Sequence, residues 1–182
     1  SWRKNWDNEQ LPFYYVQLSS LNRPSWPWFR DSQRRLMNEI PNTGMAVCTD
    51  RGDSLDVHPT RKQEVGERLA RWALNKTYGH HVIPSGPLYK SVVFNKNVAY
   101  VSFDYADGMK AAEEGAELKT FEVAGEDQMF YPAKAVVEGN RVKVWSDQVK
   151  EPKIVRYGWQ PFTRANLVNG EGLPASTFRS DN

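Results

Sequence analysis

The chain of 182 residues contains one cysteine, Cys48, and no long apolar run. A single cysteine cannot close a disulfide within the chain, so cysteine usage leaves the redox compartment open. No stretch approaches the ~20 apolar residues that a membrane helix requires. The sequence therefore predicts no membrane span.

An excess of charge of one sign is also missing, because 24 basic residues face 22 acidic ones. A net charge of +2 is too small for the electrostatic footprint of a nucleic-acid-binding protein, and this class of partner is excluded. The histidine pair His80-His81 lies without a nearby cluster of carboxylates or cysteines, so we expect a solvated linker rather than a metal site. We expect neither a metal nor a cofactor.

The composition changes along the chain. Valine rises from 5 residues in 1–84 to 12 residues in 85–182. Valine favours pleated, half-buried surfaces, so the change predicts a helix-containing first part and a β-rich second part. The junction is expected within His80–Leu88, where two prolines and a glycine disfavour both a helix and a central strand.

In the first part, apolar patterns predict two strands and two helices in alternation. Leu11–Leu18 and Gly44–Thr49 have the near-continuous apolar pattern of strands buried on both faces. Apolar residues at helical spacing predict helices within Phe29–Ile40, after a loop rich in proline and tryptophan, and within Val65–Ala73, with Gly79 closing the second. This order is typical of a parallel α/β sheet.

Two such βα units are too few for a whole doubly wound domain. We therefore expect a partner or a further N-terminal piece to complete the layer. The second part has several short strands with turn signals between them, which is typical of a β-sandwich. The expected strands are Leu88–Phe94, Ala99–Phe103, Leu118–Val123, Ala133–Val137, Arg141–Trp145 and Lys153–Tyr157, with a hairpin turn at Glu138–Asn140.

The segment Asp50–Pro59 is the leading candidate for a chemical site. It follows the second predicted strand, and catalytic groups of open α/β sheets gather at the carboxyl ends of strands. A histidine that acts as general base needs a partner on its other ring nitrogen, and both Asp56 and Asp53 are near enough to His58 in sequence. The alternative is an acidic surface loop in which His58 only caps a turn or the following helix.

A nucleophile is harder to find. The chain has no Gly-x-Ser-x-Gly elbow. Ser19 and Ser20 follow the first predicted strand but lack the glycine context of an oxyanion hole, and Cys48 lies within an apolar strand, where a thiol is inert. The residues alone thus offer a histidine base without a clear nucleophile.

An ordered set of motifs resembles the C-terminal half of the bacterial sialate O-acetylesterases, a family of SGNH-type serine hydrolases. The resemblance runs from about Leu11 to Phe178. It rests on Leu11–Leu18, Pro41–Val47, Asp56–Pro59, Lys62–Ala70, Ser85–Tyr89 and Gly172–Ser176. It implies hydrolysis of acetyl esters on sugars by a serine nucleophile and a histidine base, with His58 at the family's histidine, and it favours an extracytoplasmic location.

The sequence departs from the family pattern at two points, and both affect the expected catalytic residues. The Gly-Gln-Ser-Asn nucleophile block is absent, so this resemblance implies that an N-terminal half of the same enzyme supplies the serine and that the chain alone is inactive. Where many SGNH enzymes have their triad aspartate, three residues before the histidine, this chain has Leu55. The ring of His58 is then oriented by Asp56, by Asp53 or by a backbone carbonyl.

The expected fold is thus the C-terminal part of an SGNH-type α/β hydrolase domain (residues 1–84) followed by a β-sandwich accessory domain (residues 85–182). The expected function is hydrolysis of O-acetylated sialic acid. One alternative is an acetylxylan esterase or another sugar acetylesterase on the same scaffold. The other is a non-catalytic carbohydrate-binding or interaction module.

Overall fold

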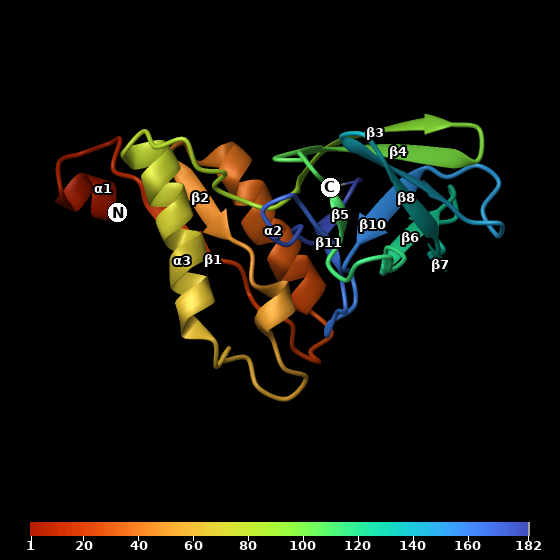
Figure 1. Ribbon diagram of the computed structural model, residues 1–182, viewed down its shortest axis with the longest axis horizontal. Coiled ribbons are helices and arrows are strands. Elements are labelled where there is room, and N and C mark those ends of the chain that lie inside the picture. Colours follow the sequence, from red (N-terminus) through yellow and green to blue (C-terminus); the bar gives the residue numbers. More distant parts are fainter. Residues whose placement is uncertain (182) are drawn as a thin grey trace.

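The computed structural model describes residues 1–181, which form a mixed α/β structure with mostly antiparallel sheets and few helices (Figure 1). The last residue of the expected accessory domain, 182, lies outside the described residues. The helical elements all precede residue 78. They are α1 (Trp2–Asn5), α2 (Trp26–Glu39), the 3-10 turn η1 (Thr49–Arg51), α3 (Lys62–Trp72) and the π-helical turn η2 (Ala73–Thr77).

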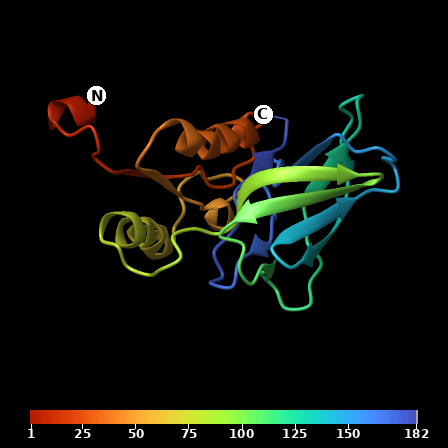
Figure 2. The same cartoon turned by 90° about the horizontal axis from the view of Figure 1, so that it is seen from above.

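A small parallel sheet forms the centre of the N-terminal part. Strand β1 (Phe13–Val16) pairs in parallel with β2 (Thr43–Ala46), and α2 connects the two. Helices α2 and α3 lie on opposite faces of this sheet (Figure 2). On the α3 face the Trp72 indole N–H donates to the Met45 carbonyl oxygen at 2.9 Å, and its ring leaves no room for a side chain at Gly44. The predicted alternation of strands and helices is confirmed.

The prediction that the first strand is fully buried was wrong. None of the four residues of β1 is buried, and Phe13 and Val16, at its two ends, are 41% and 36% exposed. The reason is that β1 pairs only with β2 among the described residues, so its second edge has no neighbouring strand. By contrast, the last three residues of β2 are buried.

Helix α2 also differs from the expectation. It begins earlier, at Trp26, and Pro27 is tolerated as its second residue, because the first N–H groups of a helix have no intrahelical acceptor. Its buried face is largely polar: Arg30, Asp31 and Arg34 are at most 5% exposed. The apolar residues that defined the predicted helix, with the exception of Met37, lie on the outside.

The second part contains two four-stranded antiparallel sheets that share one apolar core. Their orders are β3-β4-β9-β8 and β12-β10-β6-β7, and a short pair, β5-β11, lies beside them. The strands are β3 (Leu88–Asn95), β4 (Val98–Asp104), β5 (Lys110–Ala111), β6 (Phe121–Ala124), β7 (Tyr131–Pro132), β8 (Lys134–Glu138), β9 (Arg141–Trp145), β10 (Ile154–Tyr157), β11 (Leu167–Val168) and β12 (Phe178–Arg179). The six predicted strands are confirmed within a few residues, and the two-residue strands were missed.

A polar seam joins the two parts. The buried Arg30 guanidinium donates to the carbonyl oxygens of Gly158, Gln160 and Pro161 and to the hydroxyl of Thr177, at 2.7–3.0 Å. Residues in the segment 158–177, which follows β10 in the chain, thus contact α2. Interactions between residues more than a hundred positions apart therefore hold the N-terminal and C-terminal parts together.

Candidate functional site

The loops that follow β1 and β2 meet at the carboxyl edge of the parallel sheet. Ser20, after β1, donates from its hydroxyl to the carbonyl oxygen of Thr49, after β2, at 2.8 Å. Gly52 lies so close to the Ser20 backbone that a Cβ there would come within 2.2 Å of the Ser20 carbonyl oxygen. The two loops are therefore packed against each other, and the segment that carries His58 starts from a fixed point.

His58 and Asp56 form an exposed pair in this segment. The Nδ1 atom of the His58 ring lies 2.7 Å from Asp56 Oδ1, and the same oxygen accepts the backbone N–H of His58 at 2.9 Å. These hydrogen bonds, the backbone one first, hold the pKa of the Asp56 carboxyl below its usual range. The side chains are 79% and 62% exposed, so the free ring nitrogen of His58 is open to solvent and to a substrate.

The other candidate carboxylate does not reach the histidine. Asp53 Oδ1 accepts the backbone N–H of Leu55 at 2.8 Å, which closes a local turn. Of the three orienting groups that the sequence left open, the structure brings the Asp56 carboxylate to the ring, although Asp56 stands only two residues before His58.

The two serines at this edge are buried and act as supports. Ser19 is 4% exposed and donates to the carbonyl oxygen of Val57 at 2.9 Å, directly before His58. Ser20 is fully buried on the carbonyl oxygen of Thr49. A nucleophile must approach its substrate, so neither serine fits that role. Among residues 1–181, no serine, threonine or cysteine side chain forms a hydrogen bond with the His58 ring.

Sequence reasoning missed a charged pair that fixes the start of this loop. The Arg68 guanidinium of α3 donates to both carboxylate oxygens of Asp50, at 2.6 and 2.7 Å, and to the carbonyl oxygen of Val47. Bidentate pairs of this kind are strong and fix the relative orientation of the two side chains. The spacing between Asp50 and Arg68 gives no local signal, because only the fold brings α3 over the end of β2.

Cys48 lies beneath the same loop and is fully buried. Burial raises the pKa of its thiol, and Arg68 offsets this effect only in part. A thiol in this state is protonated at neutral pH and unreactive. It therefore contributes packing rather than a nucleophile.

Residues 1–181 contain neither a metal-ligand cluster nor a membrane-spanning helix. In the part of the chain that the structure describes, no group of three or more His, Cys, Asp or Glu side chains is placed to hold a metal ion. None of the helices there has both the length and the apolar character needed to cross a membrane.

Comparison with solved structures shows a likeness that extends over the whole chain. The chain is similar to a carbohydrate acetylesterase from Xanthomonas citri whose crystal structure is known, with 38% sequence identity and a TM-score of 0.92. The match covers all of this chain and 44% of that protein, so the chain spans less than half of its length. No family model matches the sequence, and no curated protein is similar to it.

Proposed function

We propose that this chain is the C-terminal, histidine-bearing portion of a carbohydrate O-acetylesterase. The observation that carries the proposal is the 2.7 Å contact between His58 Nδ1 and Asp56 at the exposed carboxyl edge of a parallel sheet. This arrangement holds the ring with its other nitrogen directed away from the carboxylate, as a general base requires. The likeness to a carbohydrate acetylesterase over the whole chain supports the reaction class.

In the proposed reaction, His58 transfers protons. Its Nε2 atom takes the proton of a serine hydroxyl as that oxygen attacks the acetyl carbonyl carbon, and it returns the proton to the sugar oxygen that leaves. The ring then deprotonates a water molecule, which attacks the acyl carbon. As the bond from that carbon to the serine oxygen breaks, the ring gives the proton to the serine oxygen and acetate leaves. Asp56 stabilises the imidazolium formed in each step and keeps the ring in place.

The serine is proposed to come from an N-terminal half of the enzyme that docks on β1. The second edge of β1 is unpaired among the described residues. Beside it α2 presents an exposed apolar stripe, formed by Phe29, Leu36 and Ile40. Gln33 of the same helix donates a hydrogen bond to the carbonyl oxygen of Val16, the last residue of β1. A strand added to β1 and a helix packed on this stripe would bury both features.

With such an N-terminal half, the chain would contribute to two domains of the enzyme. Residues 1–84 are assigned to an SGNH-type α/β hydrolase domain that the N-terminal half completes, and residues 85–182 to a β-sandwich accessory domain. The two four-stranded sheets with one shared core support the second assignment. The finer proposal for the substrate is O-acetylated sialic acid, on the resemblance of the motifs around His58.

A reconstitution experiment tests the function. The 182-residue chain is combined with the polypeptide that bears the Gly-Gln-Ser-Asn block, and acetate release from O-acetylated sialic acid and from acetylated xylan is measured. We expect activity only in the mixture, and higher activity on sialic acid. A faster rate on xylan would favour the acetylxylan alternative, whereas saturable turnover by the chain alone would place the nucleophile within it.

His58→Ala provides the specific test. It should lower the rate of the mixture on the order of 10³–10⁶-fold, as for other triad histidines. The matched control is His81→Ala, which removes another exposed histidine. An unchanged rate in His58→Ala would remove His58 from the mechanism. Glycan binding by residues 85–182 without any esterase activity in the mixture would instead favour the non-catalytic module.

A further inference from the structure

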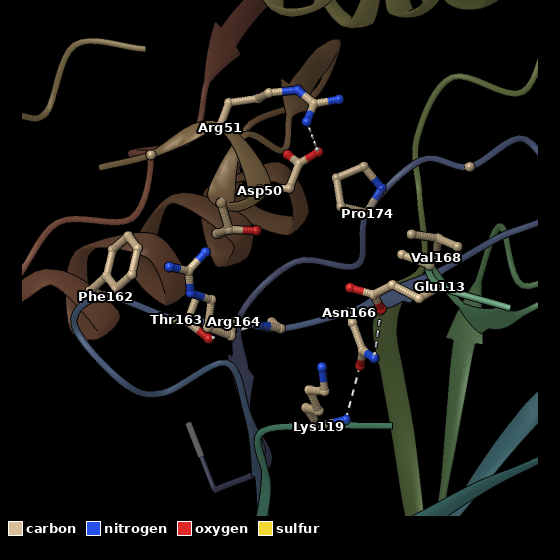
Figure 3. A pocket seen from close by; sticks show the side chains of 15 residues that line it. Asp50, Arg51, Glu113, Lys119, Phe162, Thr163, Arg164, Asn166, Val168 and Pro174 are labelled. Carbon is tan, nitrogen blue, oxygen red and sulfur yellow. Dashed lines mark hydrogen bonds and ion pairs between the residues drawn. The ribbon is translucent and has the colours of Figure 1, made fainter. Parts of the chain in front are cut away.

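A groove of about 490 Å³ borders β8, at the end of the molecule opposite α1 (Figure 1). Residues 133–137 and 116–118 line it, and most of their side chains are apolar. The polar pocket of about 390 Å³ in Figure 3 is different, because Asn166 there donates to Glu113 and accepts the backbone N–H of Lys119. The groove beside β8 is instead the side of a sheet that lacks a neighbouring strand.

Strand β8 forms one edge of its sheet. The strand order is β3-β4-β9-β8, and no strand of residues 1–181 pairs with the other side of β8. Val142 and Val144 of β9 are fully buried, whereas the residues paired with them in β8, Val137 and Ala135, remain partly exposed. The apolar core of the second part therefore reaches the surface at this edge.

Backbone groups of β8 point out of the sheet at this edge. Alternate residues of an antiparallel strand direct their N–H and C=O groups to opposite sides. Ala133 directs its N–H away from β9, to the Phe121 carbonyl oxygen at 2.9 Å, so Ala135 and Val137 also face away from β9. Within residues 1–181 their backbone groups form no hydrogen bond on that side. An edge of this kind can pair with a further strand.

The other edge of the same sheet, β3, is less suited to pairing. Its register with β4 shifts between Tyr89 and Ser91, and a bulge twists an edge and discourages strand addition. Strand β8 pairs with β9 from Lys134 to Glu138 without any shift. The regular edge of this sheet is therefore β8.

The side chains of β8 complement those of a second, antiparallel copy of β8. A two-fold axis at Val136 places Lys134 opposite Glu138 of the second copy. It also places Ala135 opposite Val137, so the residues with outward backbone groups become the hydrogen-bonded pairs. A shift by two residues would set a charged side chain opposite Val136, and a shift by one would set inner-face side chains opposite outer-face ones.

The groups needed for this pairing are accessible. Val136, on the axis, is 47% exposed. The ion pairs that Lys134 and Glu138 form within residues 1–181 lie at the surface, and the shortest, between Lys134 and Asp147, is 3.2 Å long. Ion pairs at the surface contribute little to stability, so they oppose a new pairing only weakly.

We propose that two copies of this chain associate through β8, as antiparallel strands that join two four-stranded sheets into one continuous sheet. The interface is isologous, since each copy contributes the same strand. The two Val136 side chains form a cross-strand pair, and a Lys134–Glu138 pair flanks it on each side. The association goes beyond the proposed esterase function, because it involves neither the His58 segment nor β1.

Sedimentation velocity of the 182-residue chain across a range of concentrations tests the association. We expect a reversible equilibrium between monomer and dimer. Val136→Lys places two like charges opposite each other on the axis and should raise the dissociation constant at least about tenfold. Val93→Lys is the matched control, because Val93 is 64% exposed and lies in the same cross-strand row at the β3 edge. It should leave the dissociation constant unchanged.

A charge exchange tests the register. Lys134→Glu sets two carboxylates opposite each other, twice in the dimer, and should weaken association about tenfold. The double variant Lys134→Glu/Glu138→Lys restores opposite charges at both places and should recover most of the affinity. Both side chains are exposed, so circular dichroism should show the wild-type fold in each variant. A double variant that associates no more tightly than Lys134→Glu would contradict the proposed pairing.

Hydrogen exchange locates the interface. Association should slow the exchange of the Ala135 and Val137 backbone N–H groups. A chain that stays monomeric at every concentration, a dimer that Val136→Lys does not weaken, or protection confined to β1 would each overturn the proposal. An N-terminal half that dissolves the dimer and protects the same two N–H groups would also overturn it, because β8 would then belong to the docking surface of that half.

Discussion

The Ser19 hydroxyl donates a 2.9 Å hydrogen bond to the carbonyl oxygen of Val57, the residue directly before His58. Ser19 thereby ties the loop after β1 to the histidine segment. Without it the backbone at residue 57 loses its fixed attachment, and an error of about 1 Å in the placement of a catalytic group costs on the order of 10²-fold in rate.

Ser19→Ala is therefore expected to lower kcat of the reconstituted enzyme by about 10-fold to 10²-fold with little change in KM. Its free energy of unfolding should fall by about 1 kcal/mol, the size of one hydrogen bond. Ser54→Ala is the control, because Ser54 lies in the same loop and its side chain forms no hydrogen bond among residues 1–181. A wild-type kcat in Ser19→Ala would show that the loop is held by other contacts.

The pair of Asp56 and Asp53 allows a matched test of the orienting carboxylate. Asp56→Asn should release the His58 ring from the tautomer with the proton on Nδ1, visible in ¹⁵N spectra of the ring, and reduce kcat of the reconstituted enzyme on the order of 10⁴-fold. Asp53→Asn should change neither, because an asparagine oxygen still accepts the Leu55 N–H. Equal effects of both substitutions would exclude a specific role for Asp56.

Much of the fold was predictable because its elements have strong local signals. The hairpin around Gly139, which adopts φ +62°, and the helices closed by Pro41 or by Gly79, with φ +71°, follow from chain chemistry alone. The face that each element buries was less predictable. Arg30 is an unusual residue for a buried position, and only the carbonyl groups of residues 158–161 explain why α2 turns this side inward.

The candidate site was likewise predictable only in part from the sequence. The segment containing His58 was found from its position after a strand, and both candidate carboxylates were named. The choice between Asp56 and Asp53 depends on the backbone path of the turn, which sequence spacing does not fix. The supports of the loop, Ser19 and Arg68, join segments 38 and 18 residues apart, and no local pattern marks such contacts.

Two glycines with different surroundings give a test of the packing around the parallel sheet. At Gly44 an added Cβ would come within 2.5 Å of the Trp72 ring, whereas at Gly66, within α3, nothing lies within 4 Å. Gly44→Ala should lower the free energy of unfolding by about 1–3 kcal/mol through overpacking. Gly66→Ala should raise it by about 0.5–1 kcal/mol, since alanine favours the helix. Urea denaturation checks both, and stabilisation by Gly44→Ala would mean that Trp72 moves without cost.

The half-buried Tyr15 predicts a loss of stability at alkaline pH. Burial raises the pKa of Tyr15 from 10.0 to about 12. In that range the unfolded chain releases the phenolic proton and the folded chain retains it, so the stabilisation is complete below pH 10 and is lost as the pH rises toward 12. Tyr15→Phe should therefore flatten the fall of the unfolding free energy between these pH values. An identical slope in the variant would contradict the assignment.

Arg30 offers the sharpest test of the seam between the two parts. Its guanidinium is fully buried, and burial lowers its pKa to about 10, so it remains charged at neutral pH. Arg30→Met would remove the donors from three carbonyl oxygens and the Thr177 hydroxyl, and unsatisfied buried acceptors are costly. The free energy of unfolding should fall by about 3–5 kcal/mol.

The control for this substitution is Arg61→Met, at a side chain that is 67% exposed, and it should change stability by less than about 0.5 kcal/mol. Urea denaturation followed by tryptophan fluorescence and by far-ultraviolet circular dichroism gives the readout. Because Arg30 links α2 to the C-terminal segment, wild-type protein should show one coincident transition, and Arg30→Met should separate the two signals. A single transition shifted by less than about 1 kcal/mol would mean that the seam is held mainly by other contacts, such as the 2.8 Å hydrogen bond between Gln17 and Ser176.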